Sequence, residues 1–250
     1  MPGLIRVGVG GWTYEPWRGV FYPADLPQKR ELEFASRALT SIEINGTYYS
    51  TFKPDSWRKW RDETPEGFKL SIKASRYCTN RKVLAEMGAS MERFLAQGLT
   101  ELGDKLGPIN WEFATTKKFD AEDFGAFLGL LPKTQDGVAL RHAVEVRHPS
   151  FAVPEFYELA RRHGVAIVYA LGESYPEIEE ATADFTYARM MMTREDVETG
   201  LTGEGCKSVA AKARRWAKRG DAYVYFISGG KLRNPAAAQM LIRELAGRRR

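Results

Sequence analysis

Residues 41–47 read SIEINGT and residues 68–74 read FKLSIKA, and in both stretches aliphatic and polar residues alternate. A period of two is typical of a β-strand. Residues 55–62, which lie between the two stretches, have a helical pattern. The order of strand, helix and strand predicts two neighbouring parallel strands that are joined by a crossover helix.

The same unit recurs eight times along the chain. We expect strands at 4–10, 41–47, 68–74, 109–113, 142–147, 165–170, 185–190 and 222–227. We expect helices at 30–38, 55–62, 81–100, 121–130, 154–163, 174–182, 207–218 and 235–246, of which the sixth is short and contains Pro176. Eight such units in 250 residues favour an α/β fold, a (β/α)8 TIM-barrel-like domain with a parallel eight-stranded barrel, over an open doubly wound sheet.

Composition and charge are those of an ordinary globular protein. Hydrophobic residues make up 44% of the chain and charged residues 28%, enough for a large core. We therefore expect a single domain over residues 1–250, with a short basic tail at 247–250. The formal charge of +5 is concentrated in arginines near helix ends, where the helix dipole favours them, so it is weak evidence for nucleic-acid binding.

Cysteine content and hydropathy indicate a cytoplasmic protein. Cys78 and Cys206 are far apart and form no CxxC motif, so we expect two free thiols and no cysteine-based zinc site. No apolar leader opens the sequence, and no apolar run reaches the roughly 18 residues of a membrane span. We expect no membrane association.

Charged residues occupy strand positions where a parallel sheet covered on both faces usually carries aliphatic side chains. Because side chains alternate along a strand, the aliphatic set should face the helices and the charged set the barrel axis. All lie near the C-terminal ends of their strands, where the active sites of this fold are found. The set contains three acids and three bases: Glu43, Glu112, Glu145, Lys73, Arg147 and Arg189.

Two interpretations of these six residues remain open. They can line a ligand site, or they can form an internal ion-pair network, because their charges sum to zero and buried charges must be paired. Such a network stabilises a fold poorly, which favours the ligand site. A carboxylate-only divalent metal site is a weaker alternative, and His142, His148 and His163 have no ligand spacing, so we expect no metal.

Two glycine-rich stretches do not satisfy the nucleotide-binding motifs that they resemble. Residues 200–208 read GLTGEGCKS, with one residue too many for a phosphate-binding loop and too great a distance from the preceding strand. Residues 8–11 read GVGG, but Thr13 stands where the third glycine of a dinucleotide fingerprint would be. The sequence identifies no cofactor.

Longer motifs resemble one known family. They are GVGGWTYEPWRGVFYPADLP from residue 8, EINGTYYSTFKPDSWRKWRDETPEGFKLSIKAS from residue 43, VEVRHPSF from residue 144 and YVYFISGGKLRNPAAAQMLIREL from residue 223. The chain resembles the YecE-like family, also named domain of unknown function 72. The resemblance implies a TIM-barrel-like fold and no established activity.

The family motif also implies a pocket lining. Its residues fall on Gly11, Trp12, Tyr14, Trp17, Gly19, Phe21, Tyr22, Pro23, Glu43, Asn45, Tyr48, Tyr49, Trp57, Lys73, Glu145, Arg147 and Arg189. We nevertheless expect Phe21 and Tyr22 to be core residues. The chain departs from the usual family pattern at Asn80, Glu112, Phe151, Met190, Met191 and Ser228, which identifies it as a divergent member.

These observations predict an enzyme-like barrel that binds a small anionic or polyhydroxyl ligand at its C-terminal mouth. Lys73, Arg147 and Arg189 would orient the anion, and Glu145 or Glu43 would act as general acid or base. The other expected ligand-binding residues are Trp12, Tyr14, Asn45, Tyr48 and Glu112. The alternatives are a nucleic-acid-associated protein, whose aromatic residues stack on bases, and a non-catalytic scaffold.

Overall fold

The strands form a nearly closed parallel barrel. The computed structural model describes residues 2–172 and 175–247. The main sheet has nine strands in the order β8-β7-β4-β3-β2-β1-β11-β10-β9, and all its pairs are parallel. The strands are β1 (Ile5–Gly10), β2 (Ser41–Ile44), β3 (Lys69–Lys73), β4 (Leu106–Glu112), β7 (His142–Glu145), β8 (Ala166–Ile167), β9 (Tyr169–Leu171), β10 (Phe185–Met190) and β11 (Asp221–Phe226).

The sheet has nine strands rather than the expected eight because one expected strand is divided. β8 and β9 are consecutive and are separated by Val168. β8 pairs with β7, whereas β9 pairs with β10 on the other side. The two edge strands therefore belong to one continuous segment, and the TIM-barrel-like class is confirmed.

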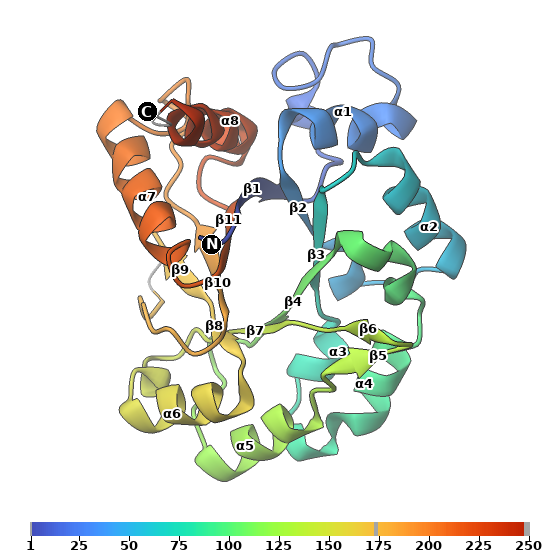
Figure 1. The fold of residues 1–250 in the computed structure, drawn as a ribbon, viewed down its shortest axis with the longest axis vertical. Helices are drawn as coiled ribbons and strands as arrows, with labels where there is room; N and C mark the ends of the chain where they lie inside the picture. The colour runs from blue at the N-terminus through green and yellow to red at the C-terminus, as the bar shows by residue number, and fades with distance from the viewer. Residues whose placement is uncertain (1, 173–174, 248–250) are drawn as a thin grey trace.

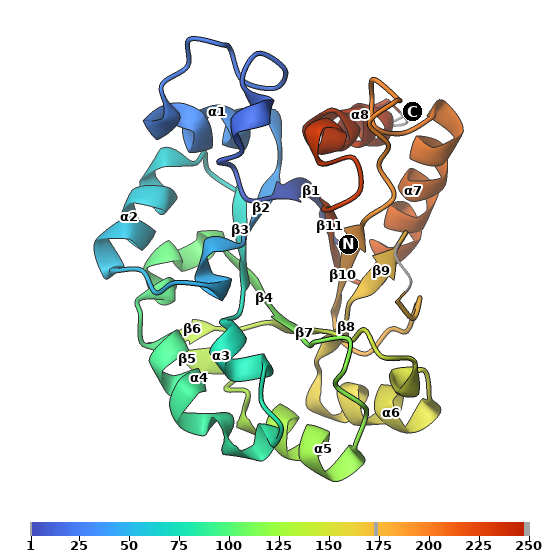
Figure 2. The same cartoon turned by 180° about the vertical axis from the view of Figure 1, so that it is seen from behind.

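Helices surround the ring of strands (Figures 1 and 2). They are α1 (Glu31–Ala38), α2 (Pro54–Glu63), α3 (Arg76–Thr79), α4 (Gly88–Leu95), α5 (Ala121–Leu130), α6 (Pro154–His163), α7 (Gly203–Trp216) and α8 (Asn234–Ala246). The prediction of a single helix at 81–100 was wrong. The region instead contains a 3-10 helix (Leu84–Met87), α4 and a second 3-10 helix (Leu99–Lys105), with a left-handed Gly98 at φ 100° between the last two.

The prediction of a helix at 174–182 was also wrong. Residue 174 lies outside the described residues, and residues 175–182 form no helix. Pro176 disfavours a continuous helix here. Thr182 instead bonds to the barrel: its hydroxyl donates to the Val165 carbonyl at 2.7 Å and accepts from the Ile167 amide at 3.1 Å. Residues 175–182, called the connecting segment below, are thereby held against β8 in a non-helical conformation.

A short antiparallel hairpin was not anticipated. Its strands are β5 (Thr134–Gln135) and β6 (Val138–Ala139). Asp136 and Gly137, at the turn, have positive φ angles of 49° and 77°. An Asp-Gly pair of this kind favours a two-residue hairpin turn, so a local signal was present in the sequence.

Side chains on the inner faces of the strands fill the barrel. An inner hydrophobic cluster consists of Ala143, Ala166, Val168, Phe185, Tyr187, Tyr223, Tyr225 and Ile227. The Tyr225 hydroxyl bonds to the hydroxyls of Ser41 and Ser71 at 2.6 Å each. At Gly8 the Ser41 carbonyl oxygen would lie 1.8 Å from an added Cβ, so β1 and β2 need glycine there.

Cys78 and Cys206 are free thiols, as expected, and both are buried. Within residues 2–172 and 175–247, no helix combines the length and apolar character that a membrane span requires. Of the expected basic tail, residues 248–250 lie outside the described residues.

Candidate functional site at the barrel mouth

The six predicted charged residues meet inside the barrel at the C-terminal ends of the strands. Arg189 of β10 is at the centre: its Nη2 lies 3.1 Å from Glu43 Oε1 on β2, and its Nη1 lies 2.9 Å from Glu112 Oε2 on β4. Nη1 also bonds to Glu145 Oε2 on β7. One guanidinium therefore contacts all three glutamates.

Glu112 joins this central group to the two remaining cations. Its Oε2 lies 2.8 Å from Lys73 Nζ and 2.6 Å from Arg147 Nη2, in addition to its bond with Arg189. Arg147 also donates to Glu145 Oε1 through Nε at 2.9 Å and through Nη2 at 2.7 Å. The six residues, called the mouth cluster below, thus form one connected ion-pair network with balanced charge.

Burial divides the mouth cluster into two levels. The side chains of Glu43 and Glu145 are fully buried, and that of Arg189 is 3% exposed. The side chains of Lys73 and Arg147 are 13% and 19% exposed. Glu43 and Glu145 are therefore sealed in the interior, while Lys73 and Arg147 reach toward solvent and Glu112, at 8% exposure, lies between the two levels.

The surroundings of Glu145 determine its protonation. Burial alone would raise its pKa, but Arg189 and Arg147 stabilise the carboxylate and lower the pKa to about 2. Burial and the charge of Glu43 raise the pKa of Tyr187 well above its usual value. At neutral pH Glu145 is therefore an anion, and Tyr187 is a neutral phenol that donates its hydrogen bond to Glu43 Oε2.

A few buried polar atoms at the mouth have no partner among the residues that the structure describes. Among residues 2–172 and 175–247, the buried atoms Asn45 Oδ1, Asn110 Oδ1 and Arg189 Nε make no hydrogen bond. Asn110 uses its amide nitrogen to donate to Glu145 Oε2 at 3.2 Å. Since buried polar atoms are normally satisfied, these atoms leave acceptor and donor capacity for solvent or a ligand.

Two tyrosines cover the exposed cations. Lys73 Nζ lies 4.3 Å from the ring centre of Tyr48, and the Arg147 guanidinium lies 4.7 Å from that of Tyr175. Both distances are within the range of cation–π interactions. Burial and the charge of Glu112 raise the pKa of Tyr48, so its hydroxyl remains protonated at neutral pH.

Trp12 and Tyr14 make their ring contacts outside the mouth cluster. The Trp12 ring packs edge-on against Trp60 of α2, with centroids 5.3 Å apart. Tyr14 packs against Trp17 at 5.5 Å and lies under Lys231 Nζ at 4.0 Å. The backbone of their loop is closer to the site, because the Gly11 amide donates to the Glu43 carbonyl at 2.8 Å.

Several aromatic residues of the family motif belong to the core rather than to a pocket. Trp17, Tyr22 and Trp57 are 1%, 2% and 0% exposed. Tyr22 was expected in the core. Phe151 and Met190, two departures from the family pattern, are also fully buried, so these two positions serve packing.

The mouth cluster is not arranged as a metal centre. Three glutamates converge, but their oxygens face the Arg189 guanidinium and the other two cations. Across the described residues, no group of three or more His, Cys, Asp or Glu side chains is placed to hold a metal ion. The donor set therefore fits a resident arginine better than a divalent cation.

Sequence reasoning missed three residues of the site. Asn110 and Tyr187 each precede a predicted site residue by two positions, so the alternation that identified Glu112 and Arg189 also placed them on the inner face. Tyr175 had no such signal, because it lies in the segment that was expected to be helical.

Comparisons with known proteins agree with this architecture. The family model described as protein of unknown function DUF72 matches residues 6–250. The YecE protein of Escherichia coli strain K12 is 24% identical over 151 residues, which cover 59% of this chain and 50% of YecE. The matched part thus spans about half the length of the curated relatives.

Solved structures show the same fold. A DUF72 family protein from Thermotoga maritima superposes with a TM-score of 0.76 at 23% identity, covering 98% of each chain. One from Enterococcus faecalis gives a TM-score of 0.70 at 13% identity, again over 98% of each chain. At these identities the likeness shows the fold alone. The family model, which matches nearly the whole sequence, shows that the chain belongs to the DUF72 family.

Proposed function

We propose that the C-terminal mouth of the barrel binds a small ligand that carries negative charge or several hydroxyl groups. The observation that carries this proposal is the division of the mouth cluster by depth. Lys73 and Arg147 are partly exposed, whereas Glu43 and Glu145 are sealed. A ligand that arrives from solvent therefore meets cations first.

Both exposed cations have capacity for a further partner. The hydrogen bonds of Arg147 to the described residues use Nε and Nη2, which leaves Nη1 available. Lys73 has three N–H donors, and its ion pair with Glu112 uses one of them. An anionic group or paired hydroxyls can accept from both cations while the protonated Tyr48 hydroxyl provides a third contact.

The buried glutamates support binding rather than proton transfer. A general acid or base works best when its pKa is near the operating pH, and Glu145 is far below it. We therefore assign Glu145 a positioning role. Glu43 has the same role because it is fully buried and paired with Arg189 at 3.1 Å, and together the two glutamates fix Arg189 and Arg147 in one orientation. A preorganised guanidinium loses less entropy on binding an anion, which raises affinity.

Isothermal titration tests the proposal, with inorganic phosphate, glycerol 3-phosphate and glycerol as separate probes. We expect at least one probe to bind, and K73M and R147M each to weaken it about tenfold, the loss expected for one charge-assisted hydrogen bond. The matched control is R141M. Arg141 lies just before the start of β7, at the opposite end from Arg147, and is also ion-paired, with Asp221 at 2.9 Å.

The control decides the interpretation. If R141M binds as tightly as the wild type while R147M does not, the ligand is bound at the mouth. Equal losses in both variants, or no binding of any probe, would contradict the proposal.

A second candidate function, binding of single-stranded nucleic acid, is favoured by one exposed group. Tyr49 and Tyr77 are each 63% exposed, and the Arg76 guanidinium lies 5.5 Å from both ring centres. Exposed aromatic rings beside a cation are a stacking platform for bases. Trp17, an aromatic residue of the family motif, is buried and unavailable for stacking.

Salt dependence tests this second candidate. We expect an unstructured DNA oligonucleotide to bind with an affinity that falls steeply as salt rises, and Y49A/Y77A to weaken it at every salt concentration. Affinity that barely changes with salt, or that persists in the double variant, would rule it out.

A further inference from the structure

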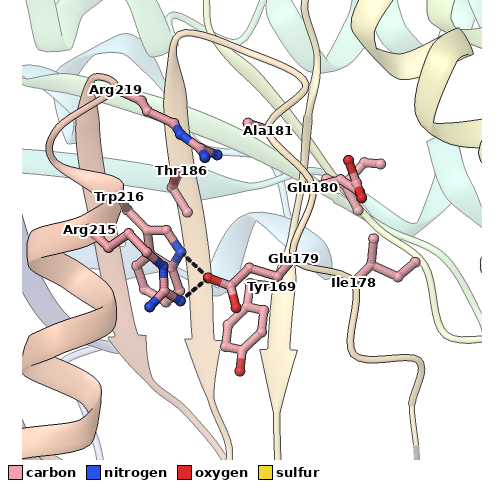
Figure 3. Close-up of a pocket in the computed structure, with 10 residues that line it drawn as sticks. Tyr169, Ile178, Glu179, Glu180, Ala181, Thr186, Arg215, Trp216 and Arg219 are labelled. Atoms are coloured by element: carbon pink, nitrogen blue, oxygen red, sulfur yellow. Dashed lines mark hydrogen bonds and ion pairs between the residues drawn. The ribbon is translucent and has the colours of Figure 1, made fainter.

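A separate cavity lies on the outer side of the barrel, where the expected sixth helix does not form. It has a volume of about 270 Å³ and lies between β8, β9, β10, the connecting segment and the C-terminal end of α7 (Figure 3). Its lining consists of Ile167, Tyr169, Ile178, Glu179, Glu180, Ala181, Thr186, Arg215, Trp216 and Arg219.

The cavity has an apolar and aromatic body. Ile167 of β8 and Ile178 of the connecting segment are 3% and 4% exposed. Tyr169 and Trp216 supply two ring faces, with centroids 5.3 Å apart and planes tilted by 58°. Surfaces of this kind accommodate a planar ring by offset or edge contacts.

The acids of the lining are already neutralised. Glu179 bonds to Arg215 and, at 2.8 Å, to the Trp216 indole nitrogen (Figure 3). It also accepts from Lys212 at 3.0 Å. Burial alone would raise the pKa of Glu179, but these partners lower it to about 2. Glu180 is paired with Arg161 at 3.3 Å. Neither acid therefore requires a cation from a ligand.

Arg219 is a cation of the lining that differs from Arg215. Among the described residues, the Arg219 guanidinium makes no ion pair or side-chain hydrogen bond, whereas Arg215 is held by Glu179. In Figure 3 the guanidinium of Arg219 extends across Thr186 toward the connecting segment at Ala181. The cavity thus has an apolar body and one uncompensated positive charge at its edge.

We propose that this cavity binds a small carboxylate with a single planar ring. Arg219 would hold the carboxylate through two parallel N–H bonds, and the Thr186 hydroxyl would add a third donor. The ring would lie against Trp216 and Tyr169. The volume is just below the range of about 300 to 1,000 Å³ typical of ligand pockets, which excludes a nucleotide-sized molecule.

This site is independent of the mouth. Thr186 and Arg189 belong to the same strand, β10, but side chains alternate, so Thr186 faces outward and Arg189 inward. The two sites are therefore on opposite faces of one sheet. Binding at one site can therefore be measured without a ligand in the other site.

Titration of the full chain with benzoate tests the proposal, with uncharged benzamide as the paired probe. We expect benzoate to bind the wild type and R219M to weaken it about tenfold or more, since a charge-assisted bidentate contact is removed. The matched control is K218M, because Lys218 is the adjacent exposed cation and does not line the cavity. Benzamide should bind the wild type more weakly than benzoate does.

Two further results distinguish this proposal from its alternatives. R147M should bind benzoate like the wild type; loss of binding there would place benzoate at the mouth and overturn the proposal. The proposal would also be overturned if the wild type did not bind benzoate, if R219M bound it as tightly as the wild type, or if K218M weakened binding as much as R219M. Circular dichroism and the melting temperature of R219M should match the wild type, because the Arg219 side chain is exposed and makes no ion pair with any residue that the structure describes.

Discussion

Arg189 and Glu43 form an ion pair of 3.1 Å inside the barrel, between strands whose contact residues are 146 positions apart in the chain. Both side chains are almost completely buried. Removing one partner of a buried pair leaves an uncompensated charge. We expect R189M to lower the free energy of unfolding by about 3–5 kcal/mol, measured by urea denaturation.

An exposed pair provides the control for this prediction. Arg194 bonds to Asp196, but both side chains are 65% exposed. We expect R194M to change the free energy of unfolding by less than about 1 kcal/mol. If R189M were as mild as R194M, its loss would not leave the buried glutamates uncompensated, which would contradict the prediction.

Two buried tyrosines allow the charge in this network to be tested separately. Tyr187 donates to the Glu43 carboxylate, whereas the Tyr225 hydroxyl bonds only to the neutral hydroxyls of Ser41 and Ser71 among the described residues. Hydrogen bonds to charged groups contribute more than neutral ones. Y187F should therefore destabilise the fold by about 1.5–3 kcal/mol and Y225F by about 1 kcal/mol. The reverse order in chemical denaturation would mean that Glu43 does not depend on Tyr187.

His142 gives the protein a defined pH dependence. Burial lowers the pKa of His142 from 6.5 to about 4, although its bond with the Pro132 carbonyl acts in the opposite direction. The neutral ring accepts a hydrogen bond from Trp111 through Nδ1 at 3.1 Å. Below pH 6.5 the unfolded chain takes up a proton that the folded chain does not, so stability falls between pH 6.5 and 4, by about 3 kcal/mol in total.

Denaturation midpoints measured across this pH window test the His142 assignment. H142Q should lower stability at pH 7 but flatten the decline between pH 6.5 and 4. H163Q, which changes an exposed histidine, should leave the decline unchanged. A decline of the same steepness in H142Q would assign the proton uptake to another group.

The fold was predictable because its signal is local and repeated. Each unit carries its own alternation and its own helix, so an error in one unit does not change the class. The sixth unit shows the limit. Its connecting segment is held by side-chain bonds such as that of Thr182 to β8, and such tertiary contacts leave no periodic pattern in the sequence.

The charged residues of the site were predictable for the same reason, because period two places Glu43, Glu145 and Arg189 on the inner face. The pairing of these charged residues was not predictable from the sequence. Which acid contacts which cation depends on barrel closure, which brings β10 opposite β2, β4 and β7. The positions of Trp12 and Tyr14 likewise depend on a loop path that no alternation describes.

Two glycines differ in whether the fold requires them: Gly8 lies where two barrel strands approach closely, and Gly129 lies on an open helix surface. An added Cβ at Gly8 would lie 1.8 Å from the Ser41 carbonyl oxygen, where β1 pairs with β2. Among the described residues, one at Gly129 of α5 would meet no heavy atom within 4 Å apart from its own stretch of helix. We expect G8A to lower the free energy of unfolding by about 3 kcal/mol or more, because a backbone must move. G129A should raise it by about 0.5 kcal/mol, because alanine favours the helix. Thermal and urea denaturation measure both. A stable G8A would show that β1 and β2 are farther apart than the close contact at Ser41 requires.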